Sequence, residues 1–411
     1  MQSTISAQKN KKEPTSDSIS AHLSSNKDEI KSLSPMLKQY HAIKSNHQDC
    51  VLFFRLGDFY EMFYEDAKIV SKELDLVLTS RGKNSLNKTP MCGFPHHASQ
   101  NYIAKLVKAG FKIAICDQTE DPSQAKGIVK REVTRIISSG TFLDEDSFQA
   151  RFILSINFHK NGNGFSFCDP TTGTIQANES NLDKHSIAEI ILTLPVYECI
   201  FPKSQKKIIE DVFNNPNLKQ KNIALSAVDD WCFNHDIARQ SLCDHFQTLN
   251  LRGFGLEEKA SATCASGALL QYLKQMNKQP LKHIDRLSLF TNEDTLFISP
   301  AAFNGLELNN FIHSINYTQT AIGKRLFYCW MTHPLKNAGL IITRQQAISQ
   351  FKNHNSVQND IKTLFQNIPD IEKNISRLSC GYTHSKDLLA IRNTLNLLPE
   401  IKKSLMPLSL R

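Results

Sequence analysis

The 411-residue sequence lacks several features that would assign it to a class at once. It has ten cysteines, yet no two form a Cys-x-x-Cys pair and none clusters with His96 and His97 as in a zinc site. No stretch approaches eighteen consecutive apolar residues, and the N-terminus has no apolar segment of the kind that directs secretion. These absences argue against a disulfide scaffold, a zinc site, a membrane span and a signal peptide. They predict a reduced, cytoplasmic protein.

The sequence also contains no nucleotide-binding loop of the form Gly-x-x-x-x-Gly-Lys-Ser/Thr. The partial match Gly323-Lys324-Arg325 ends in arginine, and Thr318 stands where the first glycine is required. No nucleophile, base and orienting group are spaced as a catalytic set. The carboxylates Asp169, Asp183 and Glu189 do not have the spacing of a metal-dependent nuclease. We therefore expect no catalytic residues, no enzymatic activity and no bound cofactor or metal in this chain.

What the sequence does contain is typical of a globular protein. Hydrophobic residues make up 40% of the chain and charged residues 21%. Its length leaves room for two to three domains. The formal net charge of +8 permits a polyanionic partner without identifying one. Residues 1–33 are rich in Ser, Lys, Asn and Gln, a composition that predicts a disordered tail.

The most informative stretch is 51–64, where an apolar run is followed by a turn signal and a cluster of aromatic residues. The run at 51–56 predicts a buried strand that stops at Gly57. Phe59 and Glu61 are two residues apart, so in an extended or turning segment they point to the same side. A flat apolar ring and a carboxylate could then face one ligand together.

A structural interpretation competes with this one. Asp58 and Glu61 have the spacing of a helix N-cap and its third helical residue, which favours a capping box. In this interpretation the Phe59 ring faces the core and extends an apolar stripe along one face of a helix. That stripe consists of Phe63, Ala67, Val70 and Leu74. Spacing alone favours this structural interpretation.

Five sequence blocks follow one another in the first part of the chain. They are Pro-Met-Leu-Lys-Gln-Tyr at 35–40, Gly-Asp-Phe-Tyr-Glu-Met-Phe at 57–63, Leu-Thr-Ser-Arg-Gly at 78–82, Pro-Met-Cys-Gly-Phe-Pro-His-His-Ala at 90–98 and Ala-Ile-Cys-Asp-Gln at 114–118. In this order they resemble the N-terminal mismatch-binding domain of the MutS family of DNA mismatch repair proteins. A second match at 298–345 resembles the start of the core or lever domain of this family. The region between them resembles the family's connector domain.

The resemblance implies a role for each residue of the Phe-x-Glu motif. The phenylalanine, here Phe59, stacks on a mispaired base from the minor groove, and the glutamate, here Glu61, hydrogen-bonds to that base. From their place in the family domain, Arg81 and Lys83 are expected to contact the DNA backbone, although an exposed loop cation is an equally good interpretation of each.

The resemblance also implies a multi-domain α/β architecture. We expect an α+β mismatch-binding domain at 34–148, an RNase H-like α/β connector at 149–275 and the start of a helical lever at 276–411. The expected elements of the first domain include helices at about 35–47, 60–75 and 98–109, strands at 51–56, 76–79, 111–118 and 131–137, a basic loop at 80–84 and an irregular segment at 90–95. In the connector, we expect a β-hairpin formed by 153–158 and 165–169.

Intact members of the family continue with a clamp, an ATPase domain that uses ATP and Mg²⁺, and a helix-turn-helix. They form homodimers and recruit the MutL repair protein. The resemblance therefore predicts that this chain is a fragment that binds mismatched double-stranded DNA weakly and in a salt-sensitive manner, without ATPase activity. The alternative is a truncated fragment that acts only as a protein-interaction piece or has no independent activity.

Overall fold

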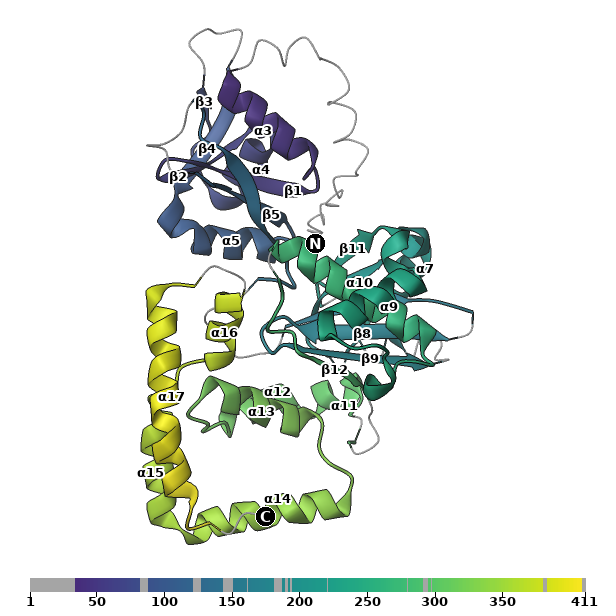
Figure 1. Cartoon of the computed structure of the whole chain (residues 1–411), viewed down its shortest axis with the longest axis vertical. Coiled ribbons are helices and arrows are strands. Elements are labelled where there is room, and N and C mark those ends of the chain that lie inside the picture. The colour runs from purple at the N-terminus through teal and green to yellow at the C-terminus, as the bar shows by residue number, and fades with distance from the viewer. Residues whose placement is uncertain are drawn as a thin grey trace, which may run out of the picture. The chain divides into compact units, whose positions relative to one another are not determined.

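The computed structural model describes residues 34–408 apart from short gaps, and these residues form two compact units (Figure 1). The first unit consists of 34–106 and 111–134, and the second of 107–110 and 135–408. The predicted tail at 1–33 and Lys83 lie outside the described residues. The internal gaps are 82–87, 121–126, 143–150, 161, 181–186, 189–190, 193, 220, 279, 291–294, 297 and 380–382.

The first unit is built on a six-stranded sheet with the order β3-β4-β2-β1-β5-β6. β1 pairs antiparallel with β2 and parallel with β5, while β4 lies antiparallel between β2 and β3. The elements are α3 (Pro35–Ser45), β1 (Cys50–Leu56), β2 (Phe59–Phe63), α4 (Tyr64–Leu74), β3 (Thr79–Arg81), β4 (Thr89–Pro95), η2 (His96–Ala98), α5 (Ser99–Lys108), β5 (Lys112–Gln118) and β6 (Arg131–Ile137).

A buried carboxylate ties α3 and α4 to the central strand of this sheet. Asp66 on α4 accepts hydrogen bonds from the Tyr40 hydroxyl at 3.1 Å and from the Leu52 backbone N–H at 3.0 Å. Lys44 on α3 completes the group with an ion pair to Asp66 at 2.9 Å. Burial and the neighbouring Asp66 charge raise the pKa of Tyr40 well above its ordinary value, so the phenol remains a donor. β1 is therefore held in a fixed place beneath the two helices.

Three predictions for the first unit are wrong, and tertiary pairing explains each of them. The helix expected from residue 60 begins at Tyr64, because 59–63 pairs with strands on both sides and buries Tyr60 and Met62 on one face. The strand expected at 76–79 begins at Thr79 and includes Arg81. The segment at 90–95, expected to be irregular, belongs to β4. The strands expected at 51–56, 111–118 and 131–137 are confirmed within one residue at each end.

The second unit contains another six-stranded sheet, with the order β11-β10-β7-β8-β9-β12. The predicted hairpin is confirmed, because β7 and β8 are antiparallel neighbours, and β9 extends it by a further antiparallel pairing. β10 is parallel to both β7 and β11. The elements up to the last strand are β7 (Phe152–Asn157), β8 (Asn163–Asp169), β9 (Thr174–Ser180), β10 (Val196–Pro202), η3 (Lys203–Gln205), α7 (Lys206–Phe213), α8 (Pro216–Lys219), β11 (Ala224–Val228), η4 (Asp230–Phe233), α9 (His235–Phe246), η5 (Arg252–Phe254), α10 (Ala260–Asn277) and β12 (Arg286–Leu289).

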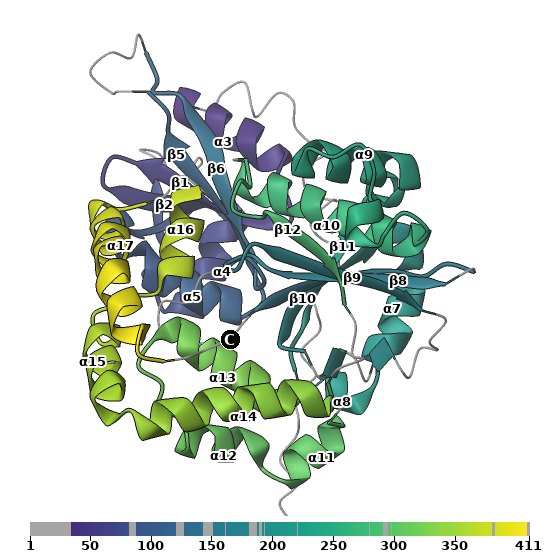
Figure 2. The ribbon, with the colours of Figure 1, turned by 60° about the horizontal axis from the view of Figure 1, so that its bottom comes forward.

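Helix α10 packs across β7, β8 and β9 and also against α9 (Figure 2). Two glycines make these close approaches possible. A Cβ atom added at Gly164 on β8 would lie 2.1 Å from the carbonyl carbon of Ser261, and one at Gly267 would lie 2.4 Å from Cβ of Ala238. Because α10 is buried along most of its length, it forms the centre of this unit's core.

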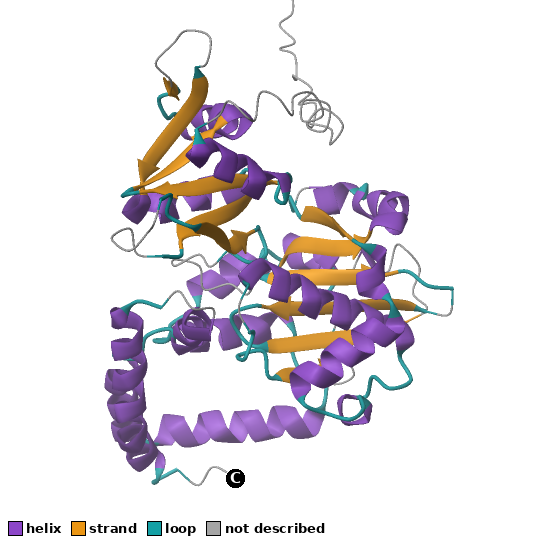
Figure 3. Ribbon diagram, turned by 45° about the horizontal axis from the view of Figure 1, so that its top comes forward, coloured by secondary structure: helices purple, strands orange, loops and turns teal. Residues whose placement is uncertain are grey.

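The remainder of the second unit is helical, as predicted (Figure 3). Its helices are α11 (Pro300–Gly305), α12 (Leu308–Ser314), α13 (Ala321–Thr332), α14 (Ala338–Asn353), α15 (Asn355–Phe365), α16 (Ile371–Ser379) and α17 (Ser385–Leu405). Several of their large apolar side chains are exposed, among them Leu326, Ile342, Ile348, Leu389 and Leu398. These helices therefore present apolar side chains to solvent in the part of the chain that the structure describes.

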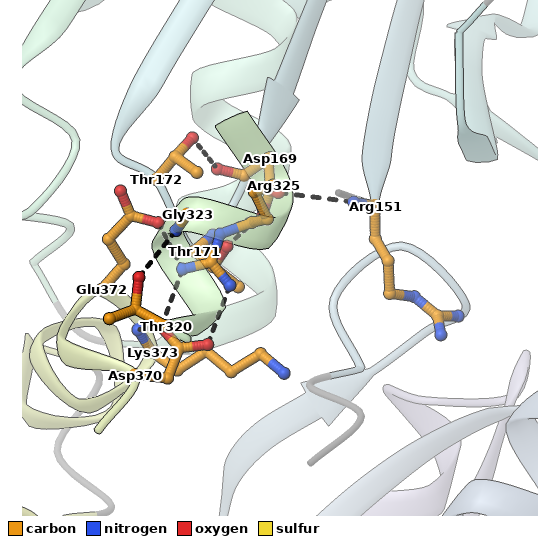
Figure 4. Close-up of polar contacts among 10 residues, drawn as sticks. All are labelled: Arg151, Asp169, Thr171, Thr172, Thr320, Gly323, Arg325, Asp370, Glu372 and Lys373. Atoms are coloured by element: carbon orange, nitrogen blue, oxygen red, sulfur yellow. Dashed lines mark hydrogen bonds and ion pairs between the residues drawn. The ribbon is translucent and has the colours of Figure 1, made fainter. Parts of the chain in front are cut away.

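The partial nucleotide-loop match is the first turn of α13. Thr320 caps this helix by accepting a hydrogen bond from Gly323 N–H at 3.0 Å. Arg325 donates from Nη1 and Nη2 to the two carboxylate oxygens of Asp370, at 2.8 Å each, and also to Glu372 (Figure 4). These contacts join α13 to the start of α16. The Gly323-Lys324-Arg325 segment therefore belongs to the contact between two helices.

The residues that the structure describes contain no candidate metal cluster, membrane-spanning helix or disulfide. No group of His, Cys, Asp and Glu side chains there could hold a metal ion. No helix in this part of the chain is long and apolar enough to cross a membrane. The described cysteines are free, and all of them except Cys329 are buried.

Candidate nucleic-acid interface

The turn between β1 and β2 fixes the start of the Phe-x-Glu motif. Gly57 adopts a φ of +58°, which glycine tolerates without a steric penalty. The carbonyl oxygen of Asp58 accepts a hydrogen bond from the His96 backbone N–H at 2.8 Å, and the His96 ring lies 3.0 Å from the same oxygen through Nδ1. Arg55 donates from Nε to the Gly57 carbonyl. The chain therefore enters β2 in one fixed direction.

Phe59 is the first residue of β2, and its side chain is directed away from the core. The residue is 46% exposed, whereas Tyr60 and Met62 on the opposite face of the strand are buried. It is paired in register with Leu56 on β1 and with Pro95 on β4. The core interpretation of Phe59 is therefore wrong, and the ring is accessible to a ligand.

Glu61 lies on the same face of β2, two residues beyond Phe59. Because it is inside a strand, it closes no capping box with Asp58, and that interpretation is also wrong. The strand position opposite Glu61 is Gly93 on β4. A Cβ atom at Gly93 would lie 3.3 Å from Cγ of Glu61, so the glycine leaves room for the glutamate side chain.

Arg81, the last residue of β3, forms an ion pair with Glu61. Its Nη1 lies 3.2 Å from Oε2 of Glu61, and the two side chains are 51% and 18% exposed respectively. Burial raises the pKa of Glu61 above its ordinary value, while the charge and hydrogen bond of Arg81 act in the opposite direction. The sequence interpretations of Arg81, as a contact to a DNA phosphate or as an exposed loop cation, both missed this pair, because the two residues are separated by twenty positions of sequence.

The buried face of β2 is anchored behind these side chains. Tyr60 donates from its hydroxyl to the Asp117 carboxylate on β5 at 2.7 Å, and Thr134 on β6 donates to the same carboxylate at 3.0 Å. Burial raises the pKa of Tyr60, with a further contribution from Asp117. The strand that carries Phe59 and Glu61 is thus fixed from beneath and on both sides.

The described residues of this surface bring together an accessible aromatic ring, a half-buried carboxylate and an exposed guanidinium. A ring can stack on a nucleobase, a carboxylate can accept a hydrogen bond from a base edge, and a guanidinium can bind a phosphate. The first unit thus has the features of a nucleic-acid-binding domain carried on a mixed sheet.

Comparison with known proteins agrees with this class. Models of MutS domain I, MutS domain II and MutS domain III match residues 34–146, 151–285 and 284–410 respectively. The chain belongs to the MutS family.

Curated relatives of the chain carry the name DNA mismatch repair protein MutS. The protein from Symbiobacterium thermophilum is 37% identical over 388 residues, which cover 90% of this chain and 44% of the relative. The one from Halothermothrix orenii is 34% identical over 400 residues, covering 92% and 43% respectively. The one from Flavobacterium psychrophilum is 34% identical over 380 residues, covering 90% and 43%. The chain thus spans less than half the length of these relatives.

Proposed function

We propose that this chain binds double-stranded DNA at mispaired or unpaired bases, as the N-terminal portion of a DNA mismatch repair protein. In this proposal Phe59 inserts at the mispaired base from the minor groove and Glu61 accepts a hydrogen bond from that base. The observation that carries the proposal is the exposure of the Phe59 ring at the start of a strand that is fixed on both edges.

Physical chemistry explains how such a surface would select a mismatch. Insertion of an apolar side chain unstacks a base step and kinks the duplex, which costs a few kcal/mol per step. A mispaired base lowers this cost because its stacking and pairing are already weak. The carboxylate of Glu61 repels phosphates, so it disfavours binding wherever no base atom is available to donate to it.

The domain assignments form part of the same proposal. We assign 34–148 to a mismatch-binding domain, 149–275 to a connector and 276–411 to the start of a lever. Within the six-stranded sheet, the order β9-β8-β7-β10-β11, with antiparallel pairs followed by parallel ones, supports an RNase H-like connector. The edge strand β12 (Arg286–Leu289) is parallel to β9 and extends this sheet beyond residue 275. The helices from α11 to α17 support the lever assignment.

We assign some activities of the family to the part of the relatives that this chain does not cover. These are the use of ATP and Mg²⁺, homodimer formation and recruitment of MutL. This chain has no Gly-x-x-x-x-Gly-Lys-Ser/Thr loop. We propose that it binds DNA without hydrolysing ATP, and that its affinity depends strongly on salt because phosphate contacts supply much of it.

The proposal is tested by competition binding to matched and G·T-mismatched duplexes of the same length at low salt. We expect the chain to prefer the mismatched duplex and Phe59→Ala to lose that preference, with an unchanged far-UV circular dichroism spectrum. Ile128→Ala is the matched control, because Ile128 is also a large apolar residue of the first unit and is 45% exposed.

Two outcomes would contradict the proposal. One is equal affinity of the unmodified chain for the two duplexes, and the other is a Phe59→Ala variant that retains the mismatch preference. Equal affinity would favour the second candidate function, a protein-interaction piece. The observation that supports this second candidate is the exposure of Trp231 (51%) on η4 and Leu225 (41%) on the edge strand β11.

A further inference from the structure

In its ion pair with Arg81, the Glu61 carboxylate contacts a guanidinium cation. This carboxylate is the group that the proposed function assigns to base recognition. Oε2 of Glu61 lies 3.2 Å from Nη1 of Arg81. The carboxylate is therefore already engaged before a base reaches it. A base donor that binds Glu61 must compete with the guanidinium or replace it.

The geometry of this pair is suited to replacement. The contact joins one Nη to one carboxylate oxygen, so Arg81 does not use the two-pronged geometry that makes arginine–carboxylate pairs strong. Its side chain is 51% exposed. Water can therefore solvate the guanidinium as it leaves the carboxylate, which keeps the cost of opening the pair small.

Arg325 shows what a structural pair looks like in the same chain. That guanidinium donates twice to Asp370 and once to Glu372, and its side chain is only 10% exposed. Among the residues that the structure describes, Arg81 has one ion-pair contact, to Glu61, and its side chain is exposed. The difference indicates that Arg81 is held more loosely than Arg325.

We infer, building on the proposed function, that Arg81 is an exchangeable counter-ion of Glu61 that determines specificity. In the free protein and on matched DNA it stays on the carboxylate. When a mispaired base donates to Glu61, the guanidinium is released and binds a DNA phosphate. Recognition of the base thereby adds a backbone contact that matched DNA does not receive.

The exchange has a measurable consequence in the salt dependence of binding. Each phosphate contact contributes about 0.9 to the slope of log affinity against log salt concentration. The exchange therefore adds about 0.9 to the slope on a mismatched duplex and nothing on a matched one. Other contacts contribute to both slopes, so the decisive quantity is how the slope difference between the duplexes changes in variants.

The test measures this slope difference between 50 and 200 mM salt, a range in which phosphate contacts are well resolved. In Arg81→Gln we expect the slope on mismatched DNA to fall by about 0.9 while the slope on matched DNA stays the same. In Glu61→Gln the guanidinium is free on both duplexes, so we expect the slope on matched DNA to rise by about 0.9. Arg81→Lys keeps the charge and should keep the difference.

Lys68→Gln is the matched control, because Lys68 is an exposed cation of the same unit that pairs with a different carboxylate, Glu65. It should leave the slope difference unchanged. Equal slope changes on both duplexes in Arg81→Gln would overturn the inference, and so would an unchanged slope on matched DNA in Glu61→Gln. The latter measurement needs no mismatch preference, so it separates failure of the exchange from failure of the proposed function.

Discussion

At the scale of single residues, the candidate interface depends on side chains that are present and on one that is absent. Phe59 supplies an exposed ring, and Glu61 supplies a carboxylate on the same face of the strand. Gly93 leaves room for the Glu61 side chain, which lies close to the position that a Cβ atom of residue 93 would occupy. The positions of all three follow from the register of β2 against β4.

The contribution of Gly93 can be measured directly with Gly93→Ala. The added methyl carbon would lie 2.9 Å from the Tyr60 carbonyl oxygen and 3.3 Å from Cγ of Glu61. Because the first of these contacts is to backbone, we expect a loss of about 1–3 kcal/mol in the free energy of unfolding, together with a weaker mismatch preference. Urea unfolding and competition binding measure the two effects.

Gly253→Ala serves as the control for this substitution, because nothing lies within 4 Å of the position where its Cβ would be built. It should change the free energy of unfolding by less than about 0.5 kcal/mol, as surface substitutions usually do. Similar losses in the two variants would show that crowding against Glu61 and Tyr60 is unimportant.

At the scale of secondary-structure elements, an ion-pair network connects α13 to α16. Arg325 reaches from the first turn of α13 to Asp370 and Glu372 at the start of α16. Asp370 also accepts a hydrogen bond from the Lys373 backbone N–H at 3.3 Å, so it caps the second helix. One carboxylate therefore serves both as a helix cap and as an ion-pair partner.

This junction predicts a specific dependence of stability on pH. Burial acts to raise the pKa of Asp370, but the hydrogen bonds and charge of Arg325 lower it overall. A carboxyl group whose pKa is depressed on folding stabilises the protein above its unfolded pKa of about 3.9, and this stabilisation is lost as the pH falls through the folded value. Asp370→Asn keeps an oxygen for the cap but removes the charge.

We expect Asp370→Asn to be less stable than the unmodified chain by about 1–3 kcal/mol at pH 6, and the gap to narrow below about pH 4. Urea unfolding at a series of pH values measures this gap. Asp285→Asn is the control, since Asp285 belongs to an exposed pair with Arg286 and should produce no comparable gap. A gap for Asp370→Asn that stays constant down to pH 2 would argue against the ion pair as its cause.

At the scale of the whole molecule, the described residues form two compact units, and the chain matches three domains of the MutS family. The chain spans less than half the length of its relatives. The proposed DNA contacts belong to the first unit, while the second contains a sheet and a set of helices with exposed apolar side chains. The chain's own sequence contains no Gly-x-x-x-x-Gly-Lys-Ser/Thr pattern.

Ligand-dependent unfolding tests this division of roles. A ligand that binds the folded chain raises its stability by about 2.7 kcal/mol at a concentration one hundred times its dissociation constant. We therefore expect Mg-ATP to leave the thermal unfolding midpoint unchanged and a G·T-mismatched duplex at low salt to raise it. A rise with Mg-ATP would show that the chain contains a nucleotide site of another type.

Local sequence patterns were sufficient to predict several strands and the family of this protein. The apolar runs around 51–56 and 111–118 and the hairpin at 153–169 were sufficient to place strands, and ordered blocks of sequence identified the family. These features could be predicted because period, turn chemistry and motif order are properties of neighbouring residues.

Tertiary structure alone decided whether Phe59 lies inside or outside the core and which partner Glu61 has. The spacing of 58–74 favours a helix with a capping box, yet 59–63 is the strand β2 because β1 and β4 pair with it on both edges. Such a ladder depends on residues up to thirty-six positions away, as in the pairing of Phe59 with Pro95. The approach of Arg81 to Glu61 is non-local in the same way, since twenty residues separate the two in the chain.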